Sequence, residues 1–138
     1  GALAATVGGR ATDRLGSRTV IGLSIAVVTL SYLLLAGAAS SLVLLVIGVI
    51  VLDIGVQAAL VANQTRAFAV DPAAQGRINS LYMTATFIGG AVGVAISGWL
   101  MQRYGWTGVA VFGIGLGMLA GLIHLAGARA QRRAASFT

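Results

Sequence analysis

The feature that most constrains this chain is a run of 34 consecutive residues without a charged side chain, from Thr19 to Leu52. A transmembrane helix needs about 20 mainly apolar residues to cross a hydrocarbon core about 30 Å thick. The run is therefore too long for one membrane span and long enough for most of two. Over the whole chain, 58% of the residues are hydrophobic and 9% are charged, whereas roughly a quarter are charged in soluble domains. The sequence predicts an all-α integral membrane protein.

Charges and turn residues divide the chain into four complete spans. The long apolar run is least hydrophobic at residues 37–41, where a tight hairpin between two helices is expected. The predicted spans cover residues 19–38, 42–65, 78–101 and 107–128. Residues 1–9 are apolar but would rise only about 14 Å as a helix, so we interpret them as the end of a span that begins upstream in a longer protein. Residues 129–138 are expected to form a basic, poorly ordered tail.

The distribution of arginine predicts the orientation in the membrane. All nine basic side chains are arginine, and eight lie in residues 10–18, 66–77 and 129–133, on one side of the predicted membrane. Only Arg103 lies on the other side. Because cytoplasmic loops carry an excess of basic residues, the three segments and the C-terminus are predicted to be cytoplasmic. The arginines behind the net charge of +6 are thereby assigned to orientation in the lipid bilayer. Nucleic acid is not an expected partner.

The composition offers little for catalysis. The chain has no cysteine, so it has no disulfide framework, no thiolate nucleophile and no zinc site of the usual kind. It also shows no nucleophile with a base, no paired catalytic carboxylates and no phosphate-cradling loop. We expect no enzyme activity, no cofactor and no metal site.

Asp53 is the strongest single candidate for a functional residue, because it lies near the middle of a predicted span. On a helix, Gln57 lies about 40° from it and Gln64 about 20° from it, so the three polar side chains share one face. An ionisable group at this depth must face a cavity, find a partner or stay protonated. A carboxyl group that is neutral in one state and ionised in another can carry a proton. The alternative is a structural hydrogen bond to a neighbouring span.

A second helix face, on the predicted span 78–101, consists of polar or small residues along its whole length. At 100° per residue, six of its residues fall within about 40° of one line: Asn79, Met83, Thr86, Gly90, Gly93 and Ser97. Tyr82 lies about 60° from this line and could reach the same space. Such a face either packs on another helix or borders a water-filled cavity, and the sequence favours neither.

Glycine repeats mark the last two spans. They are Gly113, Gly117 and Gly121 in the last span, and Gly89 with Gly93 in the span before it. Small residues at this spacing let transmembrane helices approach closely. Helix contact is the expected role, and a bend that allows movement is the alternative. His124 is expected to be a packed or interfacial residue rather than a proton relay.

Residues 9–18 hold four of the twelve charged residues of the chain. Each charge would cost about 2.5 to 3.5 kcal/mol at the centre of a transmembrane helix, so a loop at the membrane surface is predicted. The pattern Gly9-x-x-x-Asp13-Arg14-x-Gly16-x-Arg18 resembles the cytoplasmic loop signature of the major facilitator superfamily. Residues 63–66 and 76–79 also resemble the connection between the tenth and eleventh helices of bacterial drug and sugar efflux members.

This resemblance implies the C-terminal part of a twelve-helix bundle, from the end of helix eight through helix twelve. It also implies roles for the signature residues. Gly9 would permit close helix contact, and Asp13 would lie near a helix N-terminus and pair with a basic group. Arg14 and Arg18 would join the same charge cluster, which acts as a conformational latch. Ser17 stands where a basic residue is often found, so the latch is expected to be weaker.

The resemblance further implies a secondary transporter of small organic molecules, a proton-coupled exporter that works as an antiporter by alternating access in the bacterial cytoplasmic membrane. The candidates for its substrate or proton pathway are Asp53, Gln57, Gln64, Asn79, Tyr82 and Thr86. The implied partners are the lipid bilayer, the missing N-terminal half of the same transporter, a small-molecule substrate and protons.

Two other classes remain as alternatives. The first is a small four-span scaffold or partner-binding subunit without transport activity, against which the short apolar start at residues 1–9 argues. The second is a small self-assembling exporter. A protein of that class is expected to have a carboxylate in its first full span, and residues 19–38 contain none.

Overall fold

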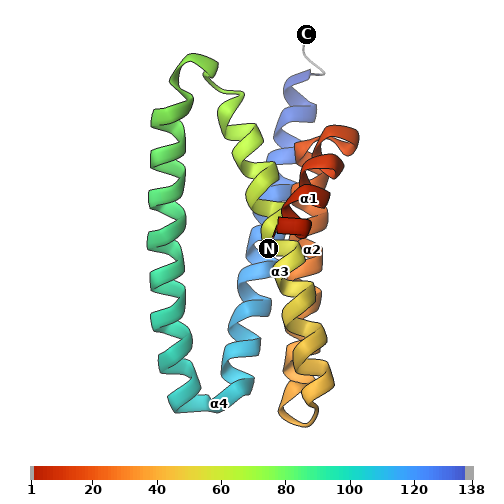
Figure 1. Ribbon diagram of the computed structural model, residues 1–138, viewed down its shortest axis with the longest axis vertical. Helices are drawn as coiled ribbons and strands as arrows, with labels where there is room; N and C mark the ends of the chain where they lie inside the picture. The colour runs from red at the N-terminus through yellow and green to blue at the C-terminus, as the bar shows by residue number, and fades with distance from the viewer. Residues whose placement is uncertain (1, 136–138) are drawn as a thin grey trace.

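The computed structural model describes residues 2–135, and these residues are helical almost throughout (Figure 1). No strand occurs between residues 2 and 135, and the predicted all-α fold is confirmed. The elements are α1 (Ala2–Leu15), α2 (Ser17–Ala36), the short 3-10 helix η1 (Gly37–Ala39), α3 (Leu42–Phe68), a second 3-10 helix η2 (Pro72–Ala74) and α4 (Gln75–Ala135).

Helix α4 consists of two antiparallel limbs that meet at Gly105 (Figure 1). Gly105 has φ 65° and ψ −159°, a conformation that essentially only glycine adopts without strain. We call residues 75–104 the first limb and residues 106–135 the second limb. The indole N–H of Trp106 donates a hydrogen bond to the carbonyl of Leu35, near the end of α2. This bond fastens the turn between the limbs to the rest of the bundle.

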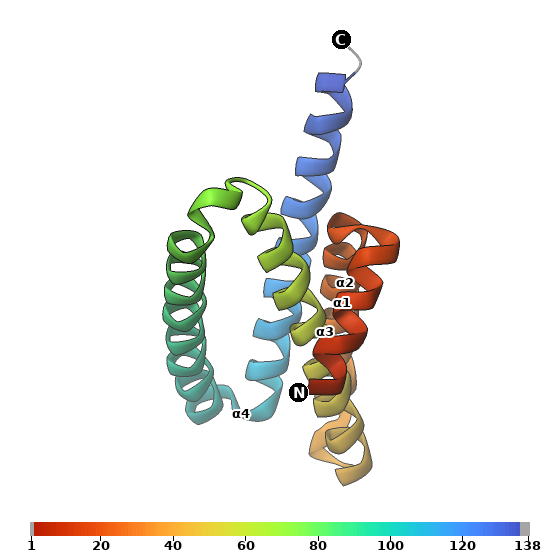
Figure 2. The ribbon, with the colours of Figure 1, turned by 45° about the horizontal axis from the view of Figure 1, so that its top comes forward.

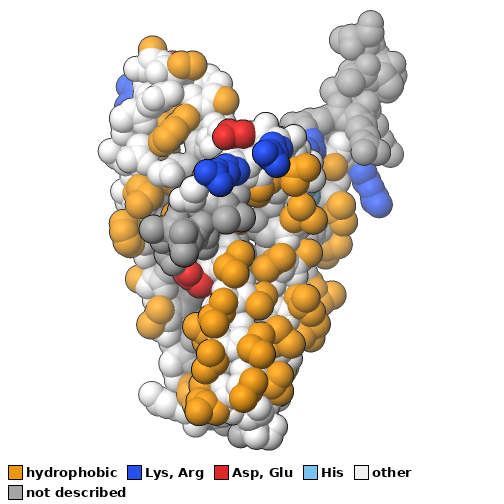
Figure 3. Space-filling model, turned by 45° about the vertical axis from the view of Figure 1, so that its right-hand side comes forward, with side chains coloured by type: hydrophobic (Ala, Val, Ile, Leu, Met, Phe, Trp, Pro, Cys, Tyr) orange, Lys and Arg blue, Asp and Glu red, His pale blue; other side chains and the backbone are white. Residues whose placement is uncertain are grey.

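The helices have the length and composition of membrane spans. Three helical segments qualify, Ser17–Ala36, Leu42–Phe68 and Pro72–Arg129. Each limb of α4 is about 45 Å long at 1.5 Å per residue, so α4 is long enough to cross the hydrocarbon twice. Large apolar side chains are highly exposed, for example Leu42 at 74% and Val94 at 75%. Figure 3 shows such side chains over most of one face, with basic side chains gathered toward one end and an acidic side chain farther down the face.

Helices α1, α2 and α3 share a small buried core. Val20, Ile21 and Ala62 form its centre, and Ala58 packs against it. A Cβ atom on Gly8 would lie 2.9 Å from the Cα atom of Ala58, so α1 and α3 touch at backbone distance. A hydroxyl group in this region bonds to its own helix: Thr12 donates to the carbonyl of Gly8 at 2.8 Å. Hydrocarbon offers no alternative partner for such groups.

The second limb of α4 packs on α2 through its glycine face. A Cβ atom on Gly113 would lie 2.3 Å from the ring of Tyr32, and one on Gly117 would lie 2.2 Å from the hydroxyl oxygen of Thr29. The expected helix contact is therefore confirmed for the last span. On the first limb, Gly89 and Gly93 have no described atom within 4 Å of such a Cβ position. Figures 1 and 2 both show this limb standing apart from α2 over most of its length.

Two expectations about local structure are wrong. Residues 9–18 do not form a loop, because α1 continues to Leu15 and α2 begins at Ser17. Only Gly16, with φ 80°, breaks the helix. Charged side chains near a helix end can reach water without unwinding the backbone. The basic tail is likewise helical as far as Ala135, since its alanine, glutamine and arginine residues favour helix. Residues 136–138 lie outside the described residues.

We predict that Gly117→Leu separates α2 from the second limb and lowers the free energy of unfolding by about 1 to 3 kcal/mol, the usual cost of overpacking. The new side chain would collide with Thr29, which cannot retreat because it is part of α2. Thermal or denaturant unfolding of the full-length protein in detergent measures the effect.

Gly115→Leu is the matched control, because a Cβ atom at Gly115 meets no described atom within 4 Å. The two positions are two residues apart on one helix and share the same loss of glycine flexibility. Equal destabilisation by both substitutions would contradict the proposed contact.

Candidate functional site

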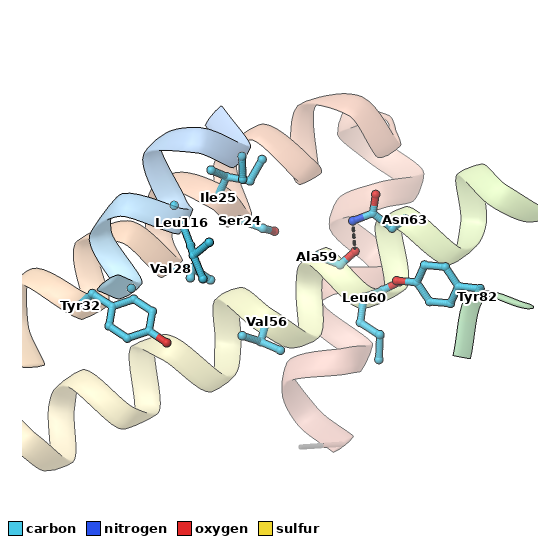
Figure 4. Close-up of a pocket in the computed structure, with 13 residues that line it drawn as sticks. Ser24, Ile25, Val28, Tyr32, Val56, Ala59, Leu60, Asn63, Tyr82 and Leu116 are labelled. Carbon is cyan, nitrogen blue, oxygen red and sulfur yellow. Dashed lines mark hydrogen bonds between the residues drawn. The ribbon is translucent and has the colours of Figure 1, made fainter. Parts of the chain in front are cut away.

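A cavity of about 380 Å³ lies between α2, α3 and the two limbs of α4 (Figure 4). Its volume falls within the range of small-molecule pockets, roughly 300 to 1,000 Å³. Apolar side chains make most of its wall, and polar groups come from Ser24, Tyr32, Asn63 and Tyr82. Among the described lining residues none carries a formal charge. Such a wall can hold an organic molecule by apolar contact and orient it by a few hydrogen bonds.

The polar groups of this cavity are partly engaged with the backbone. The hydroxyl of Tyr82 donates to the carbonyl of Leu60 at 3.4 Å, a long and therefore weak bond. The amide nitrogen of Asn63 donates to the carbonyl of Ala59 at 2.8 Å. Figure 4 shows Tyr32 and Tyr82 at opposite ends of the drawn cavity. Each tyrosine therefore provides a hydroxyl group at one end of the cavity.

A polar contact between α3 and the first limb of α4 lies next to the cavity. The amide nitrogen of Gln64 donates to the amide oxygen of Asn79 at 2.9 Å, and it lies 4.0 Å from the sulfur of Met83. We call Gln64, Asn79, Tyr82 and Met83 the polar helix contact. The structure thus brings together three of the six residues predicted for the pathway, and Tyr82 connects this contact to the cavity.

The remaining three predicted residues lie elsewhere. Asp53 is exposed and Gln57 is half-buried, and neither lines the cavity. Each lies three positions, or about 60° around α3, from a lining residue, namely Val56 and Leu60. Thr86 is exposed and its hydroxyl donates to the carbonyl of Tyr82 on its own helix. A pathway role for these three residues stays a prediction.

The polar or small face of the first limb divides into two parts. Asn79 and Met83 contact α3, as described above, whereas Gly90, Gly93 and Ser97 border a second hollow of about 560 Å³. Tyr32 lies on the wall of both hollows. Tyr32 cannot be recognised as a site residue from the sequence, because one tyrosine in an apolar span carries no signal of its own. Its place follows only from the contact with Gly113.

Two of the signature residues, Gly9 and Asp13, lie on α1. Gly8, not Gly9, makes the close helix contact, and a Cβ atom on Gly9 would have no described atom within 4 Å. Asp13 is exposed in the last turn of α1, four residues before α2 begins at Ser17. Its expected pairing with a basic group near a helix N-terminus stays a prediction. The latch stays a prediction.

The remaining signature residues surround the junction of α1 and α2. Arg14 lies in the last turn of α1 and is exposed, where a basic side chain interacts favourably with the helix dipole. Arg18 lies in the first turn of α2 and is half-buried. Gly16 separates the two helices with its positive φ, which explains why the pattern requires glycine there.

Helices of this length and apolar composition define a multi-pass membrane protein. The sequence profile of the Major Facilitator Superfamily matches residues 1–136, and the chain belongs to this superfamily. It is 37% identical over 105 residues to the "Putative uncharacterized transporter YgaY" of Escherichia coli strain K12 and to the "Uncharacterized transporter YgaY" of Escherichia coli O157:H7. The matched segment covers 76% of this chain and 27% of each relative. No solved structure matches significantly.

We predict that Gln64 and Asn79 are energetically coupled. In a double-mutant cycle with Gln64→Leu and Asn79→Leu, the coupling energy in the full-length protein should be about 0.6 kcal/mol and at most about 1.7 kcal/mol, the range for hydrogen bonds between transmembrane helices. Unfolding in detergent measures it. A second cycle that pairs Gln64→Leu with Thr86→Val should give no coupling, because the hydroxyl of Thr86 bonds to the carbonyl of Tyr82 on its own helix. Additive effects in the first cycle would contradict the contact.

Proposed function

We propose that this chain forms the C-terminal part of a secondary transporter that exports small organic molecules in exchange for protons by alternating access. The observation that carries the proposal is the cavity of about 380 Å³ among the membrane-spanning helices, with its apolar wall and few polar groups. Membership of the superfamily and the relatives named as transporters support a transporter rather than an enzyme. The chain spans about a quarter of the length of these relatives, and transport belongs to the whole protein.

The wall of the cavity favours an uncharged or weakly polar organic substrate. None of its described residues is acidic or basic, so a fully ionised substrate would leave water without a counter-charge there. Tyr32 and Tyr82 offer hydroxyl groups and aromatic faces, and Asn63 offers an amide. These groups would orient the substrate by hydrogen bonds while the apolar wall provides most of the affinity.

Asp53 is the proposed proton carrier. It lies eleven residues after the start of α3, about 17 Å along the helix axis and therefore near the middle of the membrane. It is placed beside the cavity rather than in it, since the cavity is lined by the adjacent face of α3. A change in the charge of Asp53 would then shift or rotate α3 and alter the cavity wall. Such indirect coupling does not require substrate and proton to share one site.

The first limb of α4 is the proposed moving part. Few of its residues are buried, and it is held by the polar helix contact at one end and by the Gly105 turn at the other. Its uncovered side would face the N-terminal half of the transporter. The end of α1 and the start of α2 carry the signature residues, and they would form the latch on the cytoplasmic side. The C-terminus would also lie in the cytoplasm.

Replacing Asp53 by Asn is predicted to abolish proton coupling in the full-length protein, because an amide cannot take up and release a proton at neutral pH. Transport in proteoliposomes with and without a pH gradient measures it. Asp71→Asn is the control: Asp71 caps η2 by accepting a hydrogen bond from the N–H of Ala73, and asparagine also caps helices. Gradient-driven transport that survives Asp53→Asn unchanged would exclude Asp53 as the carrier.

Leu116→Trp is predicted to block substrate binding, because Leu116 lines both hollows and a larger ring would fill them. We expect at least a tenfold fall in kcat/KM, equal to about 1.4 kcal/mol. Leu119→Trp is the matched control on the same limb, since Leu119 is 53% exposed and lines neither hollow. Equal effects of the two substitutions would contradict the cavity as the binding site. A full-length protein without any transport would favour the scaffold alternative.

A further inference from the structure

Tyr82 is the one residue of the first limb among the described residues that line the cavity of about 380 Å³. The other lining residues belong to α2, α3 and the second limb. Tyr82 is half-buried, whereas residues 84–92, which follow it on the first limb, are all exposed. Figure 4 shows its ring extending toward Leu60 of α3. A molecule in this cavity therefore meets the first limb at Tyr82.

The hydrogen bond of Tyr82 can be exchanged without leaving a backbone group unpaired. Its hydroxyl donates to the carbonyl of Leu60 at 3.4 Å, whereas hydroxyl donors usually lie about 2.5 to 3.0 Å from an acceptor oxygen. Leu60 lies inside α3, where the helix pairs each carbonyl with the N–H four residues later. The carbonyl of Leu60 thus keeps a partner when the hydroxyl turns away. An acceptor oxygen of a ligand can then take the hydroxyl at a shorter distance.

A firmer contact lies about one helical turn away. The amide nitrogen of Gln64 donates to the amide oxygen of Asn79 at 2.9 Å, and Asn79 precedes Tyr82 by three residues. One bond of ordinary length and one long bond thus join the first limb to α3. When Tyr82 changes its partner, the bond of Asn79 stays in place. The limb can therefore turn about Asn79 instead of separating from α3, and the exposed residues beyond Tyr82 move farthest.

The cavity sets the length and polarity of a molecule that reaches Tyr82. Its wall follows α2 from Ser24 to Tyr32, which is about 12 Å. It follows α3 from Val56 to Asn63, which is about 10 Å. None of the described lining residues is charged, and apolar side chains make most of the wall. The amide of Asn63 lies at the same end as Tyr82 (Figure 4), and its bond within α3 uses one of its two N–H donors. This end therefore suits an acceptor oxygen.

We propose that Tyr82 couples occupancy of the cavity to the position of the first limb, an inference that rests on the proposed function. The substrate class is an uncharged, elongated organic molecule about 10 to 12 Å long, with a carbonyl or ether oxygen at one end. That oxygen accepts the Tyr82 hydroxyl, which leaves the carbonyl of Leu60, and the limb turns about the Asn79 contact. A hydrocarbon of the same shape leaves the bond to Leu60 in place and does not move the limb.

The binding test uses the full-length protein in detergent and two uncharged probes of one shape. They are 4-acetylbiphenyl and 4-isopropenylbiphenyl, in which a methylene group replaces the ketone oxygen, and equilibrium dialysis gives both affinities. Tyr82→Phe should weaken the ketone about fivefold, as expected for one neutral hydrogen bond, and leave the hydrocarbon unchanged. Tyr104→Phe is the matched control and should change neither affinity, because Tyr104 is 61% exposed and lines neither hollow. Equal losses for both probes with Tyr82→Phe, or no loss for the ketone, would overturn the role of Tyr82.

Leu116→Trp separates this inference from the proposed function. It should weaken both probes at least tenfold, because it fills the cavity whatever the polar group of the ligand. When Leu116→Trp weakens both probes but Tyr82→Phe does not discriminate between them, the inference alone fails. When Leu116→Trp leaves both affinities unchanged, the cavity is not the binding site, and the proposed function fails together with the inference. A wild-type protein that binds neither probe would overturn the substrate class.

A second measurement follows the position of the first limb. Leu30→Cys on α2 and Phe87→Cys on the first limb, both at exposed positions, carry spin labels in an otherwise cysteine-free full-length protein. Double electron–electron resonance then gives the distance between the labels. Saturating 4-acetylbiphenyl should shift this distance, 4-isopropenylbiphenyl should not, and Tyr82→Phe should abolish the shift. Equal shifts with both probes, or a shift that survives Tyr82→Phe at saturation, would contradict coupling through Tyr82.

Discussion

Close approach of helix backbones at glycine is the interaction on which the rest of this structure depends. Hydrocarbon outside the bundle is as apolar as the side chains. Burial of apolar surface therefore contributes little to the free energy of helix association. Van der Waals contact at short range must hold them together instead. Gly8 brings α1 onto α3, Gly55 brings α3 onto Val28 of α2, and Gly113 with Gly117 brings the second limb onto α2. Helix α2 is thereby the common partner of α3 and the second limb.

The first limb of α4 lacks such contacts, and this difference shapes the cavity. Its glycines have no close neighbour among the described residues, and its main ties to α3 are the hydrogen bond of Gln64 to Asn79 and the weaker one of Tyr82. A cavity bounded on three sides by tightly packed helices and on the fourth by a loosely held limb can change its volume at small cost. If the first limb moves as we propose, it need not break a close-packed seam.

Most of the arginines lie at one end of the bundle, whereas Asp53 and Arg103 lie elsewhere. The end of α1, the start of α2 and the end of α3 meet there, and Arg18 and Arg66 line a hollow whose described wall contains no acidic residue. In a bilayer, charged side chains at helix ends reach the headgroup region, where water and lipid headgroups can solvate them.

The sequence by itself determined the membrane-spanning, all-helical class, the superfamily and the helix contact of the Gly113 face, because these depend on local hydrophobicity, charge and residue spacing. It did not locate the loop-free junction at Gly16, since the preference of Arg10 and Asp13 for water does not say whether their backbone is helical. Only the tertiary structure decided that Gln64 bonds to Asn79, that Tyr82 reaches the carbonyl of Leu60, that Tyr32 lines two hollows and that Asp53 is not among the residues that line the cavity. These facts depend on the rotation and tilt of each helix against its neighbours, which side-chain contacts set and periodicity along one helix does not contain.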